Sequence, residues 1–170
     1  MKLMVICAVV TASVLAETAS ADPTYLIRKD TDIGGFKLTS DATLRAAIDA
    51  YGAPTSRLPY EGQACIVVWS EFGIRINFSH VVSMTPCDGR GCHSETTLTS
   101  SKWKTDKGLH VGDSLKRLRQ VYRRAKLFIS QRWTLISRPF AGTRLPTLLP
   151  TVNKGRIVAF VIRSPWLLSC

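Results

Sequence analysis

One stretch of the chain, residues 108–122, limits the folds open to it more than any other, because it has the pattern of a capped amphipathic helix. Asp113 or Ser114 can cap the free N–H groups of the first turn. The apolar residues that recur on one side of this helix are Leu115, Leu118 and Tyr122. A helix of this length is not stable alone, so its apolar side must pack against other structure.

A weaker copy of this stretch lies about seventy residues upstream. Segment 35–38 matches segment 108–111, and with a shift of two residues Leu44 falls over Leu115 and Tyr51 over Tyr122. Any two buried helices share this period, so chance similarity is the alternative interpretation. The match predicts two repeats, covering about residues 33–105 and about residues 106–170.

Between and after the two helices, the hydrophobic period changes to that of strands. Alternating apolar residues predict strands over 65–69, 74–78 and 156–162. Segment 145–152 is also predicted to be extended. It contains Pro146 and Pro150, which place it at a sheet edge or in irregular pairing. The predicted class is α+β, with two helix-plus-antiparallel-meander repeats that form one curved antiparallel sheet and helices on one face.

The first 21 residues are predicted to be a cleaved signal peptide. Lys2 is followed by an apolar run from residue 3 to residue 15 and by the small-x-small site at 19–21. The run is short for a membrane span, and a retained N-terminal anchor is the alternative. We therefore expect residues 22–170 to form a single α+β domain that is secreted, extracellular or associated with the cell wall, with no transmembrane anchor.

The chain is strongly basic, with 23 Lys and Arg against 12 Asp and Glu and a net charge of +11. Such a protein is drawn to polyanions, among them cell-wall polymers, anionic lipid surfaces and acidic proteins. Export makes nucleic acid the least natural of these partners. The expected partner is an envelope polyanion or an extracellular protein, and the charge identifies neither of them.

Four cysteines remain after the predicted cleavage, and an even number in an exported chain indicates two disulfides. The favoured pairing is Cys65–Cys87 with Cys92–Cys170. Closure of the short Cys87–Cys92 loop is the main rival. A zinc site that uses His93 beside Cys92 is a further alternative, although the spacing matches no strong zinc pattern. We expect no metal.

The second predicted helix differs from the first in the charge of its outer face. Its cations, uninterrupted by an acid, form the candidate polyanion-binding site: Lys116, Arg117, Arg119, Arg123, Arg124 and Lys126. Ordinary solvated faces mix both signs of charge. A merely solvated face remains the alternative, because cations near a helix C-terminus are favourable in themselves.

The Gly-Leu-x-Val-Gly-Asp-Ser run, with Leu115, Leu118 and Tyr122 after it, resembles a segment of secreted actinobacterial proteins of uncharacterised function. The arrangement resembles the tandem repeats of the β-lactamase-inhibitor-protein-like fold, and small outer-membrane assembly lipoproteins of Gram-negative bacteria have a similar single unit. The resemblance covers roughly residues 35–162. It implies a repeated helix-plus-sheet unit, protein binding through an exposed sheet face and no enzyme activity. No stretch matches the inhibitor's contact loops, so no inhibitory residue is carried over.

The common catalytic sequence motifs are absent from this sequence. It contains no Gly-x-Ser-x-Gly, no His-Glu-x-x-His and no phosphate-binding glycine loop. We expect no catalytic residue and no cofactor. The leading hypothesis is an exported, non-enzymatic binding module of the envelope or medium. The runner-up is an inhibitor or modulator of an extracellular enzyme, and a small hydrolase is third.

Overall fold

The computed structural model describes residues 24–39, 42–60, 64–79, 87 and 91–164. Within these residues the chain forms two α-helices and thirteen strands, which assemble into a nine-stranded and a four-stranded sheet. The predicted α+β class is therefore confirmed. The prediction of one sheet is wrong, because the first three short strands pair with one another and with β8 (Lys104–Thr105) in a separate small sheet.

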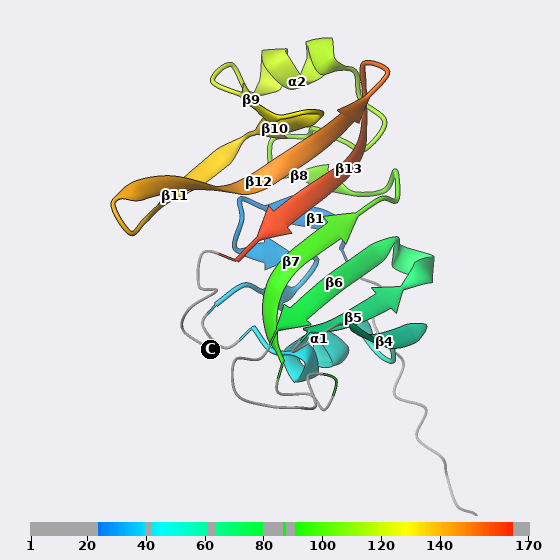
Figure 1. Cartoon of the computed structure of the whole chain (residues 1–170). Coiled ribbons are helices and arrows are strands. Elements are labelled where there is room, and N and C mark those ends of the chain that lie inside the picture. The colour runs from blue at the N-terminus through cyan, green and yellow to red at the C-terminus, as the bar shows by residue number, and fades with distance from the viewer. Residues whose placement is uncertain (1–23, 40–41, 61–63, 80–86, 88–90, 165–170) are drawn as a thin grey trace, which may run out of the picture.

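The larger sheet runs the length of the molecule and is antiparallel throughout (Figure 1). Its strands in spatial order are β4 (Ser56–Tyr60), β5 (Ala64–Trp69), β6 (Ile74–Ser79), β7 (Cys92–Leu98), β13 (Arg156–Arg163), β12 (Thr143–Asn153), β10 (Arg132–Thr134) and β9 (Lys126–Ile129), with β11 (Ile136–Phe140) paired to β12. Helix α1 (Leu44–Tyr51) lies near β4 and β5, and α2 (Leu115–Val121) lies at the opposite end near β9 and β10 (Figure 1).

The sheet has two halves with the same strand order. From the β4 edge the strands run β4, β5, β6, β7, and from the β9 edge they run β9, β10, β12, β13. The last strand of each half meets the other at the centre, where Leu98 pairs with Phe160 and Thr96 with Ile162. Each half is preceded in the chain by one helix.

The start of α1 is hydrogen-bonded to the start of β7. The side chain of Thr43 caps the helix by accepting from the backbone N–H of Ala46. The N–H of Leu44 donates to the carbonyl of Gly91 at 2.9 Å, and the N–H of His93 donates to the carbonyl of residue 42 at 2.7 Å. These bonds attach the first helix to the innermost strand of its half.

The start of α2 is bonded to β13 in the same way. Ser114 caps the helix by accepting from the N–H of Arg117 at 3.1 Å. The N–H of Leu115 donates to the carbonyl of Gly155, and the N–H of residue 157 donates to the carbonyl of Asp113, each at 2.8 Å. Leu44 and Leu115, which the sequence comparison aligned, therefore occupy the same position at the first turn of their helices.

The smaller sheet is made of short strands from two distant parts of the chain. In spatial order they are β3 (Phe36–Lys37), β2 (Asp32–Ile33), β1 (Leu26–Arg28) and β8 (Lys104–Thr105). The first three pair antiparallel, and β8 joins β1 in parallel. This sheet connects the N-terminal segment to the chain that leads into α2.

One continuous hydrophobic core lies beneath both helices, the smaller sheet and the larger sheet. Its largest fully buried side chains are Trp69, Trp103, Tyr51, Phe36, Phe78 and Phe160. The apolar positions predicted for the helices are buried at Leu44, Leu118 and Tyr122 and half-buried at Ile48. The indole N–H of Trp69 donates to the carbonyl of Gly52 at 2.9 Å, so the polar atom of that ring is satisfied.

Strand β12 is interior, so of the two predicted alternatives the edge position is wrong, while the irregular pairing is found as register shifts against β11 and β13. It pairs with β13 along one side, while the other side is shared by two short strands. Strand β11 pairs as far as Leu148 and β10 pairs at Thr151, so Pro150 lies opposite the interval between them. A proline that lacks an N–H is tolerated where the neighbouring strand is interrupted.

Candidate functional site

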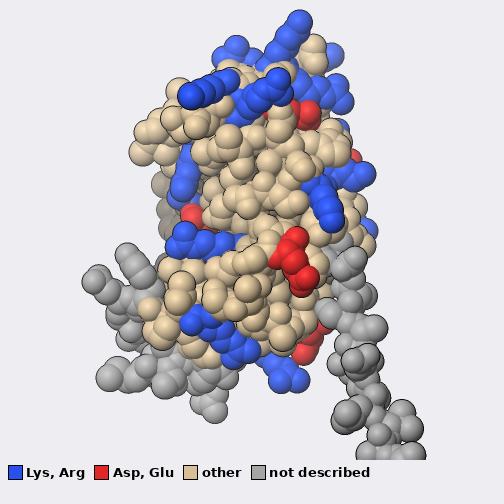
Figure 2. Space-filling model, turned by 90° about the vertical axis from the view of Figure 1, so that its right-hand side faces the viewer, with Lys and Arg blue, Asp and Glu red and all other residues tan. Residues whose placement is uncertain are grey.

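The exposed cations of α2 and of the turn after it form one surface, which we call the α2 basic surface. All six of its residues are exposed: Lys116, Arg117, Arg119, Arg123, Arg124 and Lys126. In Figure 2, Lys and Arg side chains gather at the end of the molecule where Figure 1 places α2. Every residue of the predicted binding site is therefore exposed on α2, on the segment that follows it or at the first residue of β9.

The orientation of α2 explains this exposure. Leu118 is fully buried in the core and Tyr122, the residue at the helix C-terminus, is nearly so. Because a helix repeats every 3.6 residues, Lys116, Arg117 and Arg119 are directed away from the core. The other three cations follow the C-terminus of α2 and are exposed in the segment that leads into and begins β9. Arg119 lies in the last turn, where a positive charge also interacts favourably with the helix dipole.

None of the six cations is neutralised by an ion pair within the described part of the chain. The ion pairs found there are Arg28–Asp32, Lys37–Asp32, Arg45–Asp49, Arg138–Asp30 and Arg163–Glu95. The first helix shows the contrast, since its exposed Arg45 is paired with Asp49 one turn later. The positive charge of the α2 basic surface is thus available to a partner.

Two aromatic rings lie under cations at this end of the molecule. The guanidinium of Arg119 is 4.9 Å from the centre of the Trp133 ring, and the ammonium of Lys107 is 4.9 Å from the centre of the Tyr122 ring. Trp133 is half-buried, packs against the core and is covered in part by Arg119. The contact orients this cation and links α2 to β10.

The surface is hollowed in two places. A shallow hollow of about 490 Å³ lies along α2 and is lined by Leu115, Lys116, Arg119, Gln120 and Arg123. A second one, of about 350 Å³, lies at the end of the helix and is lined by Lys107, Gln120, Val121, Tyr122, Arg123, Arg124, Ala125 and Leu135. Both are open and edged by cations, which suits contact with an extended anionic molecule.

Beside the α2 basic surface lies an apolar strand that the sequence analysis did not identify. All four residues of β9 are exposed, and the exposed fractions are 57% for Leu127, 47% for Phe128 and 59% for Ile129. The strand is at the edge of the larger sheet, and among the described residues it pairs only with β10. Its signal in the sequence is a run of three apolar residues after a basic segment, which is too short to show a period.

His93 is a buried neutral side chain. It is 3% exposed, and burial lowers its pKa to about 3. Its Nε2 lies 2.8 Å from the hydroxyl of Thr96, and its ring packs edge-on against Phe36. The alternative of a zinc site at Cys92 and His93 is not supported, because Cys92 is disulfide-bonded.

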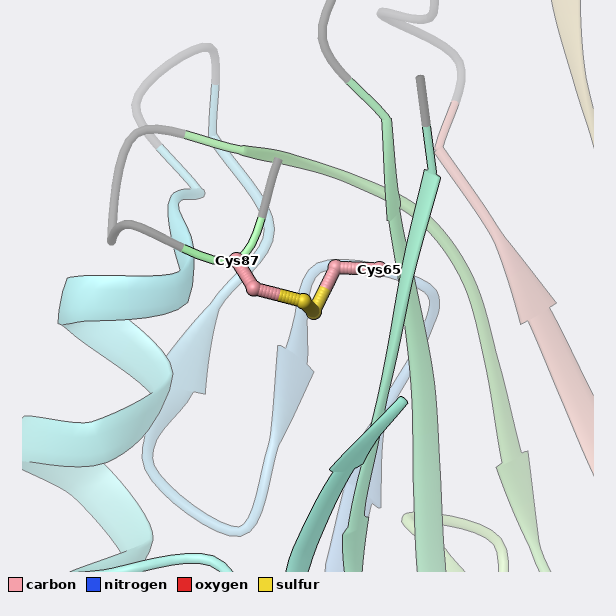
Figure 3. The surroundings of a disulfide bond; sticks show 2 residues. All are labelled: Cys65 and Cys87. Atoms are coloured by element: carbon pink, nitrogen blue, oxygen red, sulfur yellow. A yellow bond between two sulfur atoms is a disulfide. The ribbon is translucent and has the colours of Figure 1, made fainter. Parts of the chain in front are cut away.

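A disulfide joins Cys65 of β5 to Cys87, with 5.3 Å between their Cα atoms (Figure 3). This is the pairing that the sequence favoured, and it excludes the rival Cys87–Cys92 closure. Cys92 forms a disulfide as well. Its predicted partner, Cys170, lies outside the described residues, as do the predicted signal peptide and its cleavage site.

The described residues contain neither a candidate metal site nor a helix that could span a membrane. Among them no group of three His, Cys, Asp or Glu side chains is placed to hold a metal ion. Neither described helix is long and apolar enough to cross a membrane.

Comparisons of the chain with protein-family models, with curated proteins and with solved structures find no match.

Proposed function

We propose that this protein is an exported, non-enzymatic binding module that holds an anionic macromolecule on the α2 basic surface. The observation that carries the proposal is the exposure of six cations, without an acid to pair them in the described residues, around two open hollows. Clustered charge of one sign raises the local concentration of oppositely charged partners and accelerates their association. The partner is an envelope polyanion or an acidic extracellular protein.

Export is part of this proposal. The Cys65–Cys87 disulfide is compatible with an oxidising compartment, where such bonds persist. The hydrophobic run at the start of the sequence has the features of a signal peptide. Secretion then brings the basic surface to the anionic polymers and proteins of the envelope or the medium.

We further propose that the domain arose by duplication and is related in architecture to the β-lactamase-inhibitor-protein-like fold. The equal strand order of the two halves supports this, as do the equivalent hydrogen bonds at Leu44 and Leu115. An inhibitor or modulator of an extracellular enzyme is the second candidate. Its support is the sheet face opposite the core, where Ile66 and Val68 are half-exposed beside Arg75.

The proposal is tested by binding of short-chain polyphosphate and of poly-L-glutamate over a range of salt concentrations. The variant Arg117→Ser/Arg119→Ser/Arg123→Ser/Arg124→Ser should lose the salt-sensitive binding and keep the far-UV circular dichroism of the wild type. A matched control removes four exposed cations elsewhere: Lys29→Ser/Arg57→Ser/Arg75→Ser/Arg144→Ser. It should weaken binding far less, because exposed charges separated by more than about 10 Å are screened at 0.1 M salt.

Persistence of binding in the first variant would contradict the assignment to α2. Equal losses in the two variants would show a general effect of net charge without a site. The second candidate gives a different result, since an inhibitor should capture one enzyme from envelope extract and hold it at high salt.

A further inference from the structure

The two edges of the larger sheet differ in how they are protected. An edge strand presents unpaired N–H and C=O groups to any extended chain. Strand β4 carries Pro59, which has no N–H to donate. Strand β9 contains no proline, and Leu127 and Ile129 are both more than half exposed. Within the described part of the chain, the outer edge of β9 therefore offers both unpaired backbone groups and apolar side chains.

The β9 edge is continuous with the α2 basic surface. Arg119 stacks on Trp133, and Trp133 is paired directly with Leu127 in the sheet. Lys126 belongs to both, since it is the last cation of the basic surface and the first residue of the strand. A molecule that lies along β9 is thus in reach of the helix cations.

We propose that β9 accepts an additional strand from a partner protein, an extended segment that alternates apolar and acidic residues. This rests on the proposed function and narrows its partner from any anionic macromolecule to a polypeptide. Main-chain hydrogen bonds to the edge would provide the affinity, and side-chain contacts the specificity. Because Trp133 pairs with Leu127 and Arg132 with Ile129, Leu127 lies on the face of the sheet that carries Arg119 and Ile129 lies on the other face. The apolar residues of an alternating segment would therefore cover Ile129, and its acids, on the face of Arg119, would meet the cations of α2.

Two other kinds of partner, a polyanion without apolar groups and a second copy of the chain, complement only part of this surface. A sugar- or phosphate-based polyanion satisfies the charge but leaves the exposed side chains of Leu127, Phe128 and Ile129 in water. A second copy of the chain would satisfy the strand, but would bring two α2 basic surfaces together, and like charges across an interface are unfavourable. Only an acidic polypeptide complements both parts.

The test uses a fluorescently labelled, acetylated peptide that alternates valine with glutamate, and the full exported chain. Binding is measured by anisotropy, and amide hydrogen exchange of β9 is followed with and without peptide. We expect binding together with slower exchange at Leu127–Ile129. The same peptide methylated at its central backbone amides should bind about tenfold more weakly or worse, because strand addition needs those donors.

A substitution in β9 tests the same contact between peptide and protein. Leu127→Asn/Ile129→Asn should weaken peptide binding by about tenfold, an effect expected where apolar anchors are removed from an interface. Leu58→Asn on β4 is the control, because Leu58 is 54% exposed at the opposite edge. Its binding should equal that of the wild type. Both variants replace exposed side chains, so their unfolding midpoints should stay close to that of the wild type.

Each contrary result has a distinct meaning. Equal binding of the methylated and unmethylated peptides would overturn strand addition and leave the proposed binding at α2 standing. A dimer in analytical ultracentrifugation that Leu127→Asn/Ile129→Asn dissociates would show that a second copy occupies β9, which also overturns the inference. If polyphosphate, poly-L-glutamate and the peptide all fail to bind, the proposed function itself is wrong.

Discussion

Asp30 and Arg138, which are 108 residues apart in the chain, form a bidentate ion pair that joins the turn after β1 to strand β11. The Nε and Nη2 atoms of Arg138 donate to the two carboxylate oxygens at 2.8 and 2.6 Å. The side chain of Asp30 is fully buried, and the hydroxyl of Thr147 also donates to it, at 2.6 Å. Burial on its own would raise the pKa of Asp30, but the bonds from Arg138 and Thr147 outweigh burial and the pKa is lowered.

Replacing Arg138 should lower the free energy of unfolding more than replacing its partner Asp30 by an uncharged residue. Arg138→Leu leaves a buried carboxylate with fewer donors, and we expect a loss of about 2–3 kcal/mol in the free energy of unfolding. Asp30→Asn should cost less, because it removes the buried charge. Urea unfolding measures both. As a control, Arg45→Leu breaks an ion pair whose side chains are both more than 60% exposed, and should change stability by about 0.5 kcal/mol or less. A loss no larger than the control's would contradict this role of Arg138.

The sequence predicted those elements whose signal is local. The helices at Leu44–Tyr51 and Leu115–Val121 follow from apolar spacing and capping residues, and both are confirmed. Strands over 65–69, 74–78 and 156–162 followed from period-two patterns and are also confirmed. The exposure of the α2 cations is predictable for the same reason, because the apolar side of a helix determines the position of every other side chain on it.

The parts that were missed depend on contacts between distant segments. Strand β8 has two residues and pairs with β1, almost eighty positions earlier, so no local pattern indicates it. Pro150 indicated either an edge strand or irregular pairing, and the choice depends on the division of the neighbouring side between β10 and β11, which no local pattern shows. The contact of Arg119 with Trp133 likewise depends on how α2 lies over the sheet.

Removal of the Cys65–Cys87 disulfide should destabilise the domain without changing its fold. The two residues are 22 positions apart, and a cross-link that closes a loop of this length lowers the entropy of the unfolded chain by an amount worth about 3 kcal/mol. We expect this loss in urea unfolding of Cys65→Ala/Cys87→Ala, with the far-UV circular dichroism preserved. A loss well below about 1 kcal/mol would show that the loop between them is already constrained in the unfolded chain.

The contact between Arg119 and Trp133 should be measurable as a coupling energy. In a double-mutant cycle of Arg119→Ser and Trp133→Leu, we expect the two losses of unfolding free energy to be non-additive by about 0.5–1 kcal/mol, the range for exposed cation–π pairs. The matched cycle uses Arg117→Ser with Trp133→Leu, because Arg117 has no aromatic ring beneath it among the described residues. That cycle should be additive. Additivity in both cycles would show that Arg119 is oriented by the helix alone.

His93 should make the stability of the fold depend on pH between about 6.5 and about 3. In the unfolded chain the imidazole takes up a proton near its usual pKa of 6.5, whereas burial in the native structure lowers its pKa to about 3. Within this interval the unfolded state binds more protons than the native state. Acidification therefore favours unfolding, and the stabilisation is complete above pH 6.5 and lost progressively as the pH falls.

The variant His93→Gln tests this dependence, since an amide can still hydrogen-bond to the hydroxyl of Thr96 and does not titrate. Between pH 7.5 and 4.5 the wild type should lose about 3 kcal/mol more stability in urea unfolding than the variant does. The lower limit keeps the measurement above the usual pKa of 3.8 for Asp30 and Asp32, whose lowered pKa values make their own stabilisation disappear only in more acidic solution. Parallel pH curves for the two proteins would mean that His93 gains a proton in the native state without cost, and would contradict its neutral, buried state.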